Sequence, residues 1–270
     1  MEKVSIIIPT YNRADVLSLS VQSILQQTYA DFELLIVDDG SSDNTDIVVE
    51  SWHDDRIRYL KLPENKGVAA ARNEGIRQAK YDYIAFQDSD DCWMPDKLEK
   101  QMDFFMQNPE ADLLYCPYEC QKADGTVIFV PDSTIPPEEK QGNIYRHMLL
   151  RNTIGTPCVL VRRRCLETSG LFNESLTCLE DWELFLRIAK SSKIAFQEAP
   201  MVHVNLSKDG VSHNISGYYE ARCHMTAMHR DALLHYGIFQ EVTGDILVSA
   251  EKLGILTQVS QLLQYFLQKT

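Results

Sequence analysis

Three short apolar segments, each followed at once by polar and turn-forming residues, constrain the fold more than any other feature of this sequence. They cover residues 4–8, 34–37 and 83–86. Each is continuously apolar rather than alternating, which is typical of strands buried on both faces of a parallel sheet. Because segments with helical spacing separate them, we expect a mostly parallel sheet with helices on both faces.

The rest of the pattern extends this alternation of strands and helices. Helices are predicted near residues 17–25, after Asp43 as an N-cap, and over residues 67–79, 98–106 and 179–190. Further strands are predicted at residues 57–62, 113–120, 127–130, 159–162 and within 194–206, with a hairpin turn at Asp124-Gly125. Beyond about Ile215 the sequence favours helix throughout.

The polar endings of the three apolar segments indicate where a ligand would bind. They read Pro9-Thr10-Tyr11-Asn12, Asp38-Asp39-Gly40-Ser41-Ser42-Asp43 and Gln87-Asp88-Ser89-Asp90-Asp91. In an open parallel sheet, the carboxyl ends of the strands line the ligand crevice. Two acidic clusters would therefore face one cleft, where their repulsion costs stability unless cations or hydrogen-bond donors are present.

The acidic cluster at residues 88–91 predicts a divalent metal site. Three carboxylates within four residues form a poor turn, but they supply the oxygen ligands that Mg²⁺ or Mn²⁺ prefers. The cluster at residues 38–43 is open to two interpretations. It is either part of a ligand site or a solvated turn whose side chains cap the next helix.

The charge balance excludes one class of partner and sets a condition on another. Over 270 residues the formal net charge is −13, whereas a nucleic-acid-binding protein normally presents a basic face. A nucleotide diphosphate is itself an anion. A site for such a ligand would therefore need a metal ion or a local group of basic residues.

Cysteine usage and hydropathy indicate a cytoplasmic protein. The seven cysteines are odd in number and show no paired C-x-x-C spacing, so neither a disulfide framework nor a zinc site is predicted. No apolar segment approaches the roughly 18 residues of a spanning helix. Residues 4–8 are too short for the core of a signal peptide.

Five segments, in order along the chain, resemble family 2 glycosyltransferases, which have the GT-A fold. They are the opening strand at residues 4–13, the second strand at 31–43, the helix entry at 65–73, the D-x-D motif at 88–91 and the E-D motif at 179–182. The resemblance extends over roughly residues 4–200. Each motif alone is weak, but their shared order is specific. The resemblance implies transfer of a sugar from a nucleotide diphosphate sugar.

The same resemblance implies roles for individual residues of the donor site. Pro9 and Tyr11 would shape the pocket for the base, and Asp39 would accept a hydrogen bond from a uracil ring nitrogen, which favours a UDP-sugar. Guanine and thymine nucleotides also occur in the family.

Other residues would serve the ribose, the phosphates and the metal. Asp88 would contact the ribose, and Asp90 would bind Mn²⁺ or Mg²⁺, with Asp91 as the alternative ligand. Arg72 would lie beneath the nucleotide and offset the acidic cleft. Lys66 is either a further ligand for the donor or an exposed loop lysine.

Asp181 is the candidate general base. The acceptor hydroxyl must lose a proton as it attacks, so a carboxylate must lie on the opposite face of the sugar. Asp181 stands at the start of a predicted helix, whose dipole by itself would lower the pKa of the carboxyl group. A simple N-cap is the alternative. Glu180 would orient the acceptor, and a single displacement predicts inversion at the anomeric carbon.

Histidines and arginines leave two questions open. His203 and His213 are candidates for a further metal ligand, or for surface or core histidines. Residues 162–164 are three consecutive arginines after an apolar segment. They would either meet an acceptor phosphate or be solvated at the strand end.

We expect a GT-A catalytic domain over residues 1–206, with a nucleotide-sugar half at about 1–110 and an acceptor half at about 111–206. A helical C-terminal segment would follow over 207–270. From residue 215 to 270 it holds four Lys or Arg against five Asp or Glu, so it lacks the basic face of an interfacial membrane helix. Packing on the catalytic domain or on a second copy in a homodimer is expected instead.

The expected activity belongs to polysaccharide biosynthesis, with a saccharide or lipid-linked saccharide as acceptor. The protein would be cytoplasmic, with peripheral contact at the inner face of a membrane as an option. Two rival functions are a metal-dependent nucleotidyltransferase and a non-catalytic sugar-nucleotide-binding protein. A dinucleotide-dependent oxidoreductase is disfavoured, because no G-x-G-x-x-G follows any predicted strand.

Overall fold

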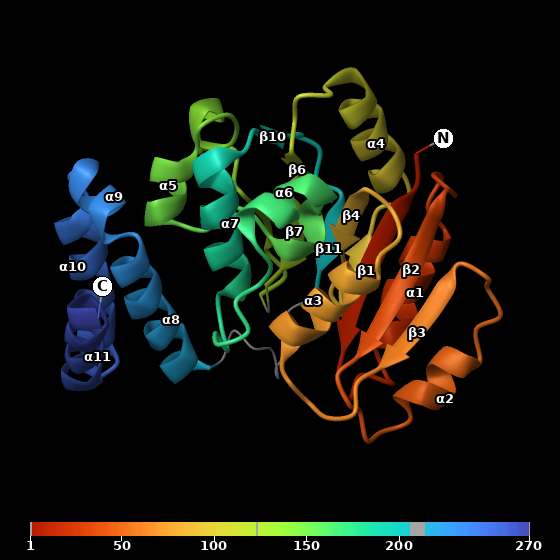
Figure 1. Cartoon of the computed structure of the whole chain (residues 1–270), viewed down its shortest axis with the longest axis horizontal. Helices are drawn as coiled ribbons and strands as arrows, with labels where there is room; N and C mark the ends of the chain where they lie inside the picture. Colours follow the sequence, from red (N-terminus) through yellow and green to blue (C-terminus); the bar gives the residue numbers. More distant parts are fainter. Residues whose placement is uncertain (1, 123, 206–213, 270) are drawn as a thin grey trace.

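The computed structural model describes residues 2–122, 124–205 and 214–269, and its central feature is a seven-stranded sheet (Figure 1). The strand order is β10-β6-β9-β4-β1-β2-β3. Strands β4, β1, β2 and β3 are mutually parallel, whereas β9 runs antiparallel to both β4 and β6. The strands are β1 (Val4–Thr10), β2 (Phe32–Asp38), β3 (Ile57–Lys61), β4 (Tyr83–Phe86), β6 (Leu113–Tyr115), β9 (Val159–Arg162) and β10 (Ile194–Phe196).

The three apolar segments that constrained the prediction are the three adjacent strands β4, β1 and β2 at the centre of this sheet. Every residue of these strands is buried, as continuous apolar character requires when helices cover both faces. Helix α3 packs closely on β1: a Cβ added at Gly75 would lie 2.5 Å from the Ile7 side chain. The helices of this part are α1 (Leu17–Leu25), α2 (Thr45–Glu50), α3 (Val68–Gln78), α4 (Lys97–Gln107), α5 (Tyr145–Leu150), α6 (Arg163–Ser169) and α7 (Glu180–Ser191).

One predicted strand is in fact divided between the large sheet and a second, four-stranded sheet. Residues 113–120 do not form a single strand, because β6 belongs to the large sheet and β7 to the small one, with Pro117 between them. Proline lacks the N–H that a continuous ladder would need. The predicted hairpin is confirmed, since β7 pairs antiparallel with β8. The small sheet has the order β5-β11-β7-β8, with β5 (Cys92–Trp93), β7 (Tyr118–Gln121), β8 (Val127–Val130) and β11 (Val202–Val204).

The end of the chain is helical, as predicted. Helices α8 (Ile215–Met228), α9 (Arg230–His235), α10 (Phe239–Lys252) and α11 (Leu256–Lys269) gather on one side of the molecule, at the left of Figure 1. Helix α8 joins this group to the rest through Arg222, whose guanidinium lies 4.7 Å from the centre of the Trp182 ring on α7. None of the helices that the structure describes has the length and apolar character to cross a bilayer.

Candidate active site

The carboxyl ends of β1, β2 and β4 border a cleft of about 530 Å³. The amino end of α3, the chain between Glu174 and Thr177, and the start of α7 complete its wall. Among the predicted site residues, those that line it are Pro9, Tyr11, Asp39, Lys66, Arg72, Asp88, Asp90 and Glu180. Asp91 and Asp181 are not among the residues that line it. Eight of these ten residues come from the three strand ends and the α3 entry that the sequence indicated.

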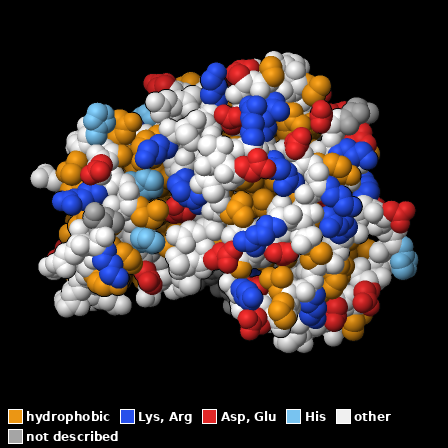
Figure 2. All heavy atoms as spheres, in the orientation of Figure 1, with side chains coloured by type: hydrophobic (Ala, Val, Ile, Leu, Met, Phe, Trp, Pro, Cys, Tyr) orange, Lys and Arg blue, Asp and Glu red, His pale blue; other side chains and the backbone are white. Residues whose placement is uncertain are grey.

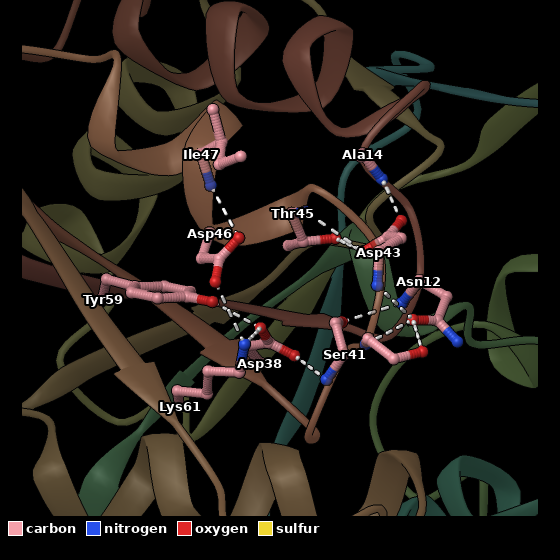
Figure 3. A network of polar contacts seen from close by, with 11 residues as sticks. Asn12, Ala14, Asp38, Ser41, Asp43, Thr45, Asp46, Ile47, Tyr59 and Lys61 are labelled. Carbon is pink, nitrogen blue, oxygen red and sulfur yellow. Dashed lines mark hydrogen bonds and ion pairs between the residues drawn. The ribbon is translucent and has the colours of Figure 1, made fainter.

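The two adjacent aspartates at the end of β2 have different surroundings. Asp38 is fully buried, and its carboxylate accepts hydrogen bonds from the backbone N–H of Ser41, 2.7 Å away, and from the hydroxyl of Tyr59 (Figure 3). Asn12 Oδ1 accepts the N–H of Ser42 at 2.9 Å, which ties the end of β1 to the same turn. The side chain of Asp38 therefore holds the turn together, while Asp39 lines the cleft.

Asp39 organises the opposite wall of the cleft. Its two carboxylate oxygens accept the N–H groups of Lys66 at 2.8 Å and Gly67 at 2.7 Å, in the loop that enters α3. Burial raises the pKa of Asp39 above its ordinary value, against the opposing effect of these two donors. Gly40 permits the approach of the loop, because it has φ +77° and a Cβ there would lie 2.8 Å from the carbonyl carbon of Glu64.

Helix α2 begins one residue later than predicted. The N-cap position is Asn44, not Asp43. Asp43 Oδ1 nevertheless accepts the N–H of Thr45 at 3.1 Å, so the side chain predicted to cap the helix still bonds its first residue.

Arg72 joins two acidic parts of the site. Its Nη2 lies 2.8 Å from Asp88 Oδ1, and its Nη1 lies 2.5 Å from Glu180 Oε1. Its guanidinium also lies 5.3 Å from the centre of the Phe172 ring. Burial alone would lower the pKa of Arg72, but the charges of Asp88 and Glu180 raise it, so the side chain stays cationic. Arg72 therefore offsets the negative charge of Asp88 and Glu180 by pairing with both carboxylates.

The three aspartates after β4 have three different environments. Asp88 is paired with Arg72, and Asp90 lines the cleft. Asp91 is buried, and its Oδ1 accepts the N–H of Asn205 at 2.9 Å. Burial, together with the charges of Asp88 and Asp90, raises the pKa of Asp91 to about 9.

The metal that the D-x-D motif implies fits this arrangement only as a shared site. Within the described ranges, no three His, Cys, Asp or Glu side chains lie close enough to hold a metal ion by themselves. Mg²⁺ in nucleotide enzymes is usually held by one or two carboxylates together with phosphate oxygens and water. Asp90, which lines the cleft, meets that requirement.

Asp181 occupies the first turn of α7, beside the cleft. The residue before the helix, Leu179, has φ +57°, which turns the chain into the helix. Asp181 Oδ1 accepts the N–H of Trp182 at 2.7 Å, and Oδ2 accepts the hydroxyl of Thr156 at 3.3 Å. Burial, aided by the charge of Glu180, raises the pKa of Asp181 from its ordinary value of 3.8 to about 6, against the opposing effect of Arg72. The helix dipole therefore does not dominate.

Several cleft residues carry no recognisable local signal in the sequence. Glu174 and Thr177 contribute from the loop before α7, and Arg13, the last residue of the matched segment at 4–13 but without an assigned role, adds a third cation to those of Lys66 and Arg72. Asn73 fixes that loop by accepting the N–H of Phe172 at 2.9 Å and donating to Glu174 Oε1 at 2.7 Å. The loop residues match no spacing rule, so only the tertiary structure brings them to the site.

The structure shows the surroundings of one of the two candidate histidines and of the three consecutive arginines. His203 lies 3.3 Å from Glu119 across the small sheet, and His213 lies outside the described residues. The three arginines contact the protein itself: Arg162 stacks on Tyr83, Arg163 donates to backbone carbonyl groups and Arg164 pairs with Asp112. On the face shown in Figure 2, acidic and basic side chains are interspersed.

The sequence matches the profile described as "Glycosyl transferase family 2" over residues 5–168. It is 36% identical over 214 residues to the Escherichia coli UDP-Glc:alpha-D-GlcNAc-diphosphoundecaprenol beta-1,3-glucosyltransferase WfgD, covering 78% of this chain and 80% of that protein. It is 34% identical over 199 residues to the Bacillus subtilis putative teichuronic acid biosynthesis glycosyltransferase TuaG, covering 72% of this chain and 74% of that protein.

Solved structures share the fold. S. aureus TarS 1-349 in complex with UDP-GlcNAc superimposes with a TM-score of 0.69 at 22% identity, over 83% of this chain and 65% of that one. The mannosyltransferase PcManGT from Pyrobaculum calidifontis, in complex with GDP-Man and Mn²⁺, gives 0.63 at 17% identity, over 98% and 84%. These likenesses show the GT-A fold.

Some relatives are longer than this chain. It covers 61% of an uncharacterized glycosyltransferase from Haemophilus influenzae and 36% of one from Rickettsia conorii, each 33% identical to it. The profile match over residues 5–168, together with relatives above 30% identity that it covers by more than two thirds, places the chain in glycosyl transferase family 2.

Proposed function

We propose that the protein is an inverting, metal-dependent glycosyltransferase that moves one sugar from a nucleotide diphosphate sugar to a hydroxyl of a saccharide or lipid-linked saccharide. One observation carries this proposal: a single cleft brings together Asp39, Asp90 and Glu180, and Asp181 follows Glu180 in the first turn of α7. Its volume of about 530 Å³ lies within the range of small-ligand sites, roughly 300–1,000 Å³.

The nucleoside would lie against Pro9, Tyr11 and Asp39. Each Asp39 oxygen accepts one backbone N–H and retains a lone pair for a base N–H, which suits uracil. Asp88 would contact the ribose, and Lys66 and Arg13 would lie near the phosphates. A UDP-sugar is favoured because WfgD is named for UDP-Glc and TarS is solved with UDP-GlcNAc, although PcManGT holds GDP-Man.

Asp90 would hold Mn²⁺ or Mg²⁺, with Asp91 as the alternative ligand. When bound, the ion supplies positive charge that neutralises the diphosphate and stabilises the departing nucleoside diphosphate. Asp91 supports the loop by accepting the N–H of Asn205. PcManGT with Mn²⁺ supports the choice of metal.

Asp181 would take the proton of the attacking hydroxyl. Its raised pKa, about 6, keeps it mostly ionised at neutral pH while leaving it basic enough to accept a proton. Glu180, held by Arg72, would orient the acceptor. One displacement without a covalent intermediate inverts the anomeric carbon. A lipid-linked acceptor, as in the name of WfgD, would bring the protein to the inner face of a membrane.

A thermal-shift screen of UDP-, GDP- and dTDP-sugars, with Mn²⁺ or with EDTA, tests the donor site. A ligand at 100 times its Kd adds about 2.7 kcal/mol of stability, so a metal-dependent rise in Tm with one nucleotide is expected. Equal shifts in Mn²⁺ and EDTA would contradict metal dependence. Binding without transfer to any acceptor would favour the non-catalytic alternative, and release of pyrophosphate would favour a nucleotidyltransferase.

A further inference from the structure

Lys97, the first residue of α4, is a fully buried lysine that does not line the cleft. Its ammonium group lies 3.9 Å from the centre of the Trp93 ring and donates to Gln101 Oε1 at 2.8 Å. The ionisable groups that favour its charged form are the side chains of Cys116 and Cys158, through their thiolate forms, rather than a carboxylate. Burial lowers the pKa of Lys97 to about 8, which leaves it mostly protonated at neutral pH.

Stability alone does not explain a lysine at this position. Removing an ammonium group from water is costly, and neither a thiol nor an aromatic face compensates for it as a carboxylate would. Replacing a buried charge by an apolar side chain of similar volume is often neutral or stabilising. The contacts that the lysine makes therefore suggest a role beyond packing.

Both side chains that Lys97 contacts bond to one short turn. Trp93 Nε1 donates to the carbonyl oxygen of Pro157 at 3.0 Å, and Gln101 Nε2 donates to that of Cys158 at 3.0 Å. These residues belong to the turn Thr156–Cys158, which precedes β9. Two successive carbonyl groups of the turn thus accept hydrogen bonds from the two side chains that hold the ammonium group.

The turn reaches the candidate base through Thr156. This side chain is buried, and its hydroxyl donates to Asp181 Oδ2 at 3.3 Å. The other end of the arrangement is anchored beside the acidic cluster, because the N–H of Trp93 donates to Ser23 Oγ at 3.1 Å and Ser20 Oγ donates to the carbonyl oxygen of Asp88 at 2.9 Å. Since Ser23 Oγ donates to the carbonyl oxygen of Ser20 at 2.7 Å, contacts through α1 connect Trp93, which holds Lys97, to the acidic strand end.

We propose that Lys97 is a positioning residue: held between Trp93 and Gln101, it fixes the Thr156–Cys158 turn and thereby the orientation of Asp181. The inference rests on the proposed function, which makes Asp181 the base. Without the ammonium group, the Gln101 amide is free to turn away from Cys158, and the carbonyl of Cys158 keeps only the weaker thiol donor of Cys116, 3.6 Å away. Misplacing a reacting group by about 1 Å can cost roughly 10²-fold in rate.

The test compares Lys97→Met, of similar shape but uncharged, with the wild type. We expect kcat to fall about 10- to 100-fold with an unchanged KM for the donor and an unchanged or raised Tm. Thr156→Val should lower kcat similarly, and the double variant should be no slower than Thr156→Val alone. Lys100→Met, an exposed change on the same helix, should leave kcat unchanged.

A second readout does not require activity. The carboxyl signal of Asp181, assigned by its loss in Asp181→Asn, is titrated by isotope-edited infrared spectroscopy. Both Thr156→Val and Lys97→Met should raise its pKa, because the carboxylate loses a well-placed donor. A wild-type protein with no transferase activity would refute the proposed function, while this titration would still test Lys97.

If Lys97→Met does not fold, Gln101→Glu tests the same inference. Glutamate pairs with Lys97 but cannot donate to the carbonyl of Cys158, so kcat should again fall and the Asp181 pKa should rise. Wild-type kcat and Asp181 titration in either folded variant would overturn the inference. Losses that simply add in Lys97→Met/Thr156→Val would also overturn it, since they would show that the two residues act independently.

Discussion

Arg72 Nη1 lies 2.5 Å from Glu180 Oε1, although 108 positions separate the two residues in the sequence. The same guanidinium binds Asp88, so a helix entry, a strand end and a second helix start meet at one buried cation. Asp88 is a proposed contact of the donor, and Glu180 is proposed to orient the acceptor. Arg72 therefore joins a residue of the proposed donor site to a residue of the proposed acceptor site.

Arg72→Met should destabilise the protein by about 3–5 kcal/mol, because it leaves two carboxylates without their partner. Adding Glu180→Gln should recover part of this loss, since one of the unpaired charges is removed. Urea unfolding of the single and double variants measures both effects. The matched control is Arg77→Met, an exposed arginine on the same helix that should cost less than about 1 kcal/mol. A fully stable Arg72→Met protein would show that the buried pairing contributes little.

Asp90→Asn should weaken binding of UDP in the presence of Mn²⁺ by about 2 kcal/mol or more, roughly 30-fold. Asp91→Asn should bind nearly as well as wild type, since the amide oxygen still accepts the N–H of Asn205. Calorimetry with Asp103→Asn, an exposed change of equal charge on α4, provides the control. If Asp91→Asn carries the loss, the ligand is one residue later; if neither does, the metal site is wrong.

Asp39→Asn should impair both folding and donor binding. An amide has one acceptor oxygen and one donor group, so one of the N–H groups of Lys66 and Gly67 would face another donor. We expect a loss of about 1–3 kcal/mol in stability and weaker UDP binding. Glu64→Gln, exposed on the same loop, is the control. Wild-type Tm and UDP affinity in Asp39→Asn would contradict the role of this carboxylate.

The stability of Asp181→Asn relative to wild type should depend on pH in a defined direction. The folded pKa of Asp181, about 6, lies above its ordinary value of 3.8. The stability that its proton gives the folded state is therefore complete below about pH 4 and is lost as the pH rises through about 6. Asn has no such loss. Measured by urea unfolding, the free energy of unfolding of Asp181→Asn relative to that of the wild type should therefore rise by about 1–3 kcal/mol between pH 4 and pH 7.5. If the free energies of unfolding of the two proteins change with pH in parallel, the pKa of Asp181 is not shifted.

The sequence predicts best where local physics decides the structure. The strand at residues 159–162 is found at Val159–Arg162, and the three apolar segments are the adjacent strands β4, β1 and β2. Burial on both faces demands apolar side chains, so the pattern is visible before folding. The same argument predicts that the acidic residues after these strands lie together, because the carboxyl ends of parallel strands meet at one edge of the sheet.

The sequence predicts least where distant segments decide the structure. Nothing near Arg72 indicates that it pairs with Glu180, and nothing near Thr156 indicates that it bonds Asp181. The distinction between Asp38, which is buried by its turn, and Asp39, which lines the cleft, depends on Tyr59 and Lys66 in other elements. Pro117 was the one local signal that should have divided the strand predicted over residues 113–120.

The most direct test of the account is the rate of sugar transfer by Asp181→Asn at saturating donor and Mn²⁺. The substitution keeps an oxygen that accepts the N–H of Trp182, but it cannot take the proton of the acceptor. General base catalysis contributes about 10²- to 10⁴-fold, so the rate should fall by that factor while donor affinity is maintained and Tm is maintained or raised. A folded Asp181→Asn protein that transfers sugar within a few-fold of the wild-type rate would contradict the account and move the role of base to Glu180.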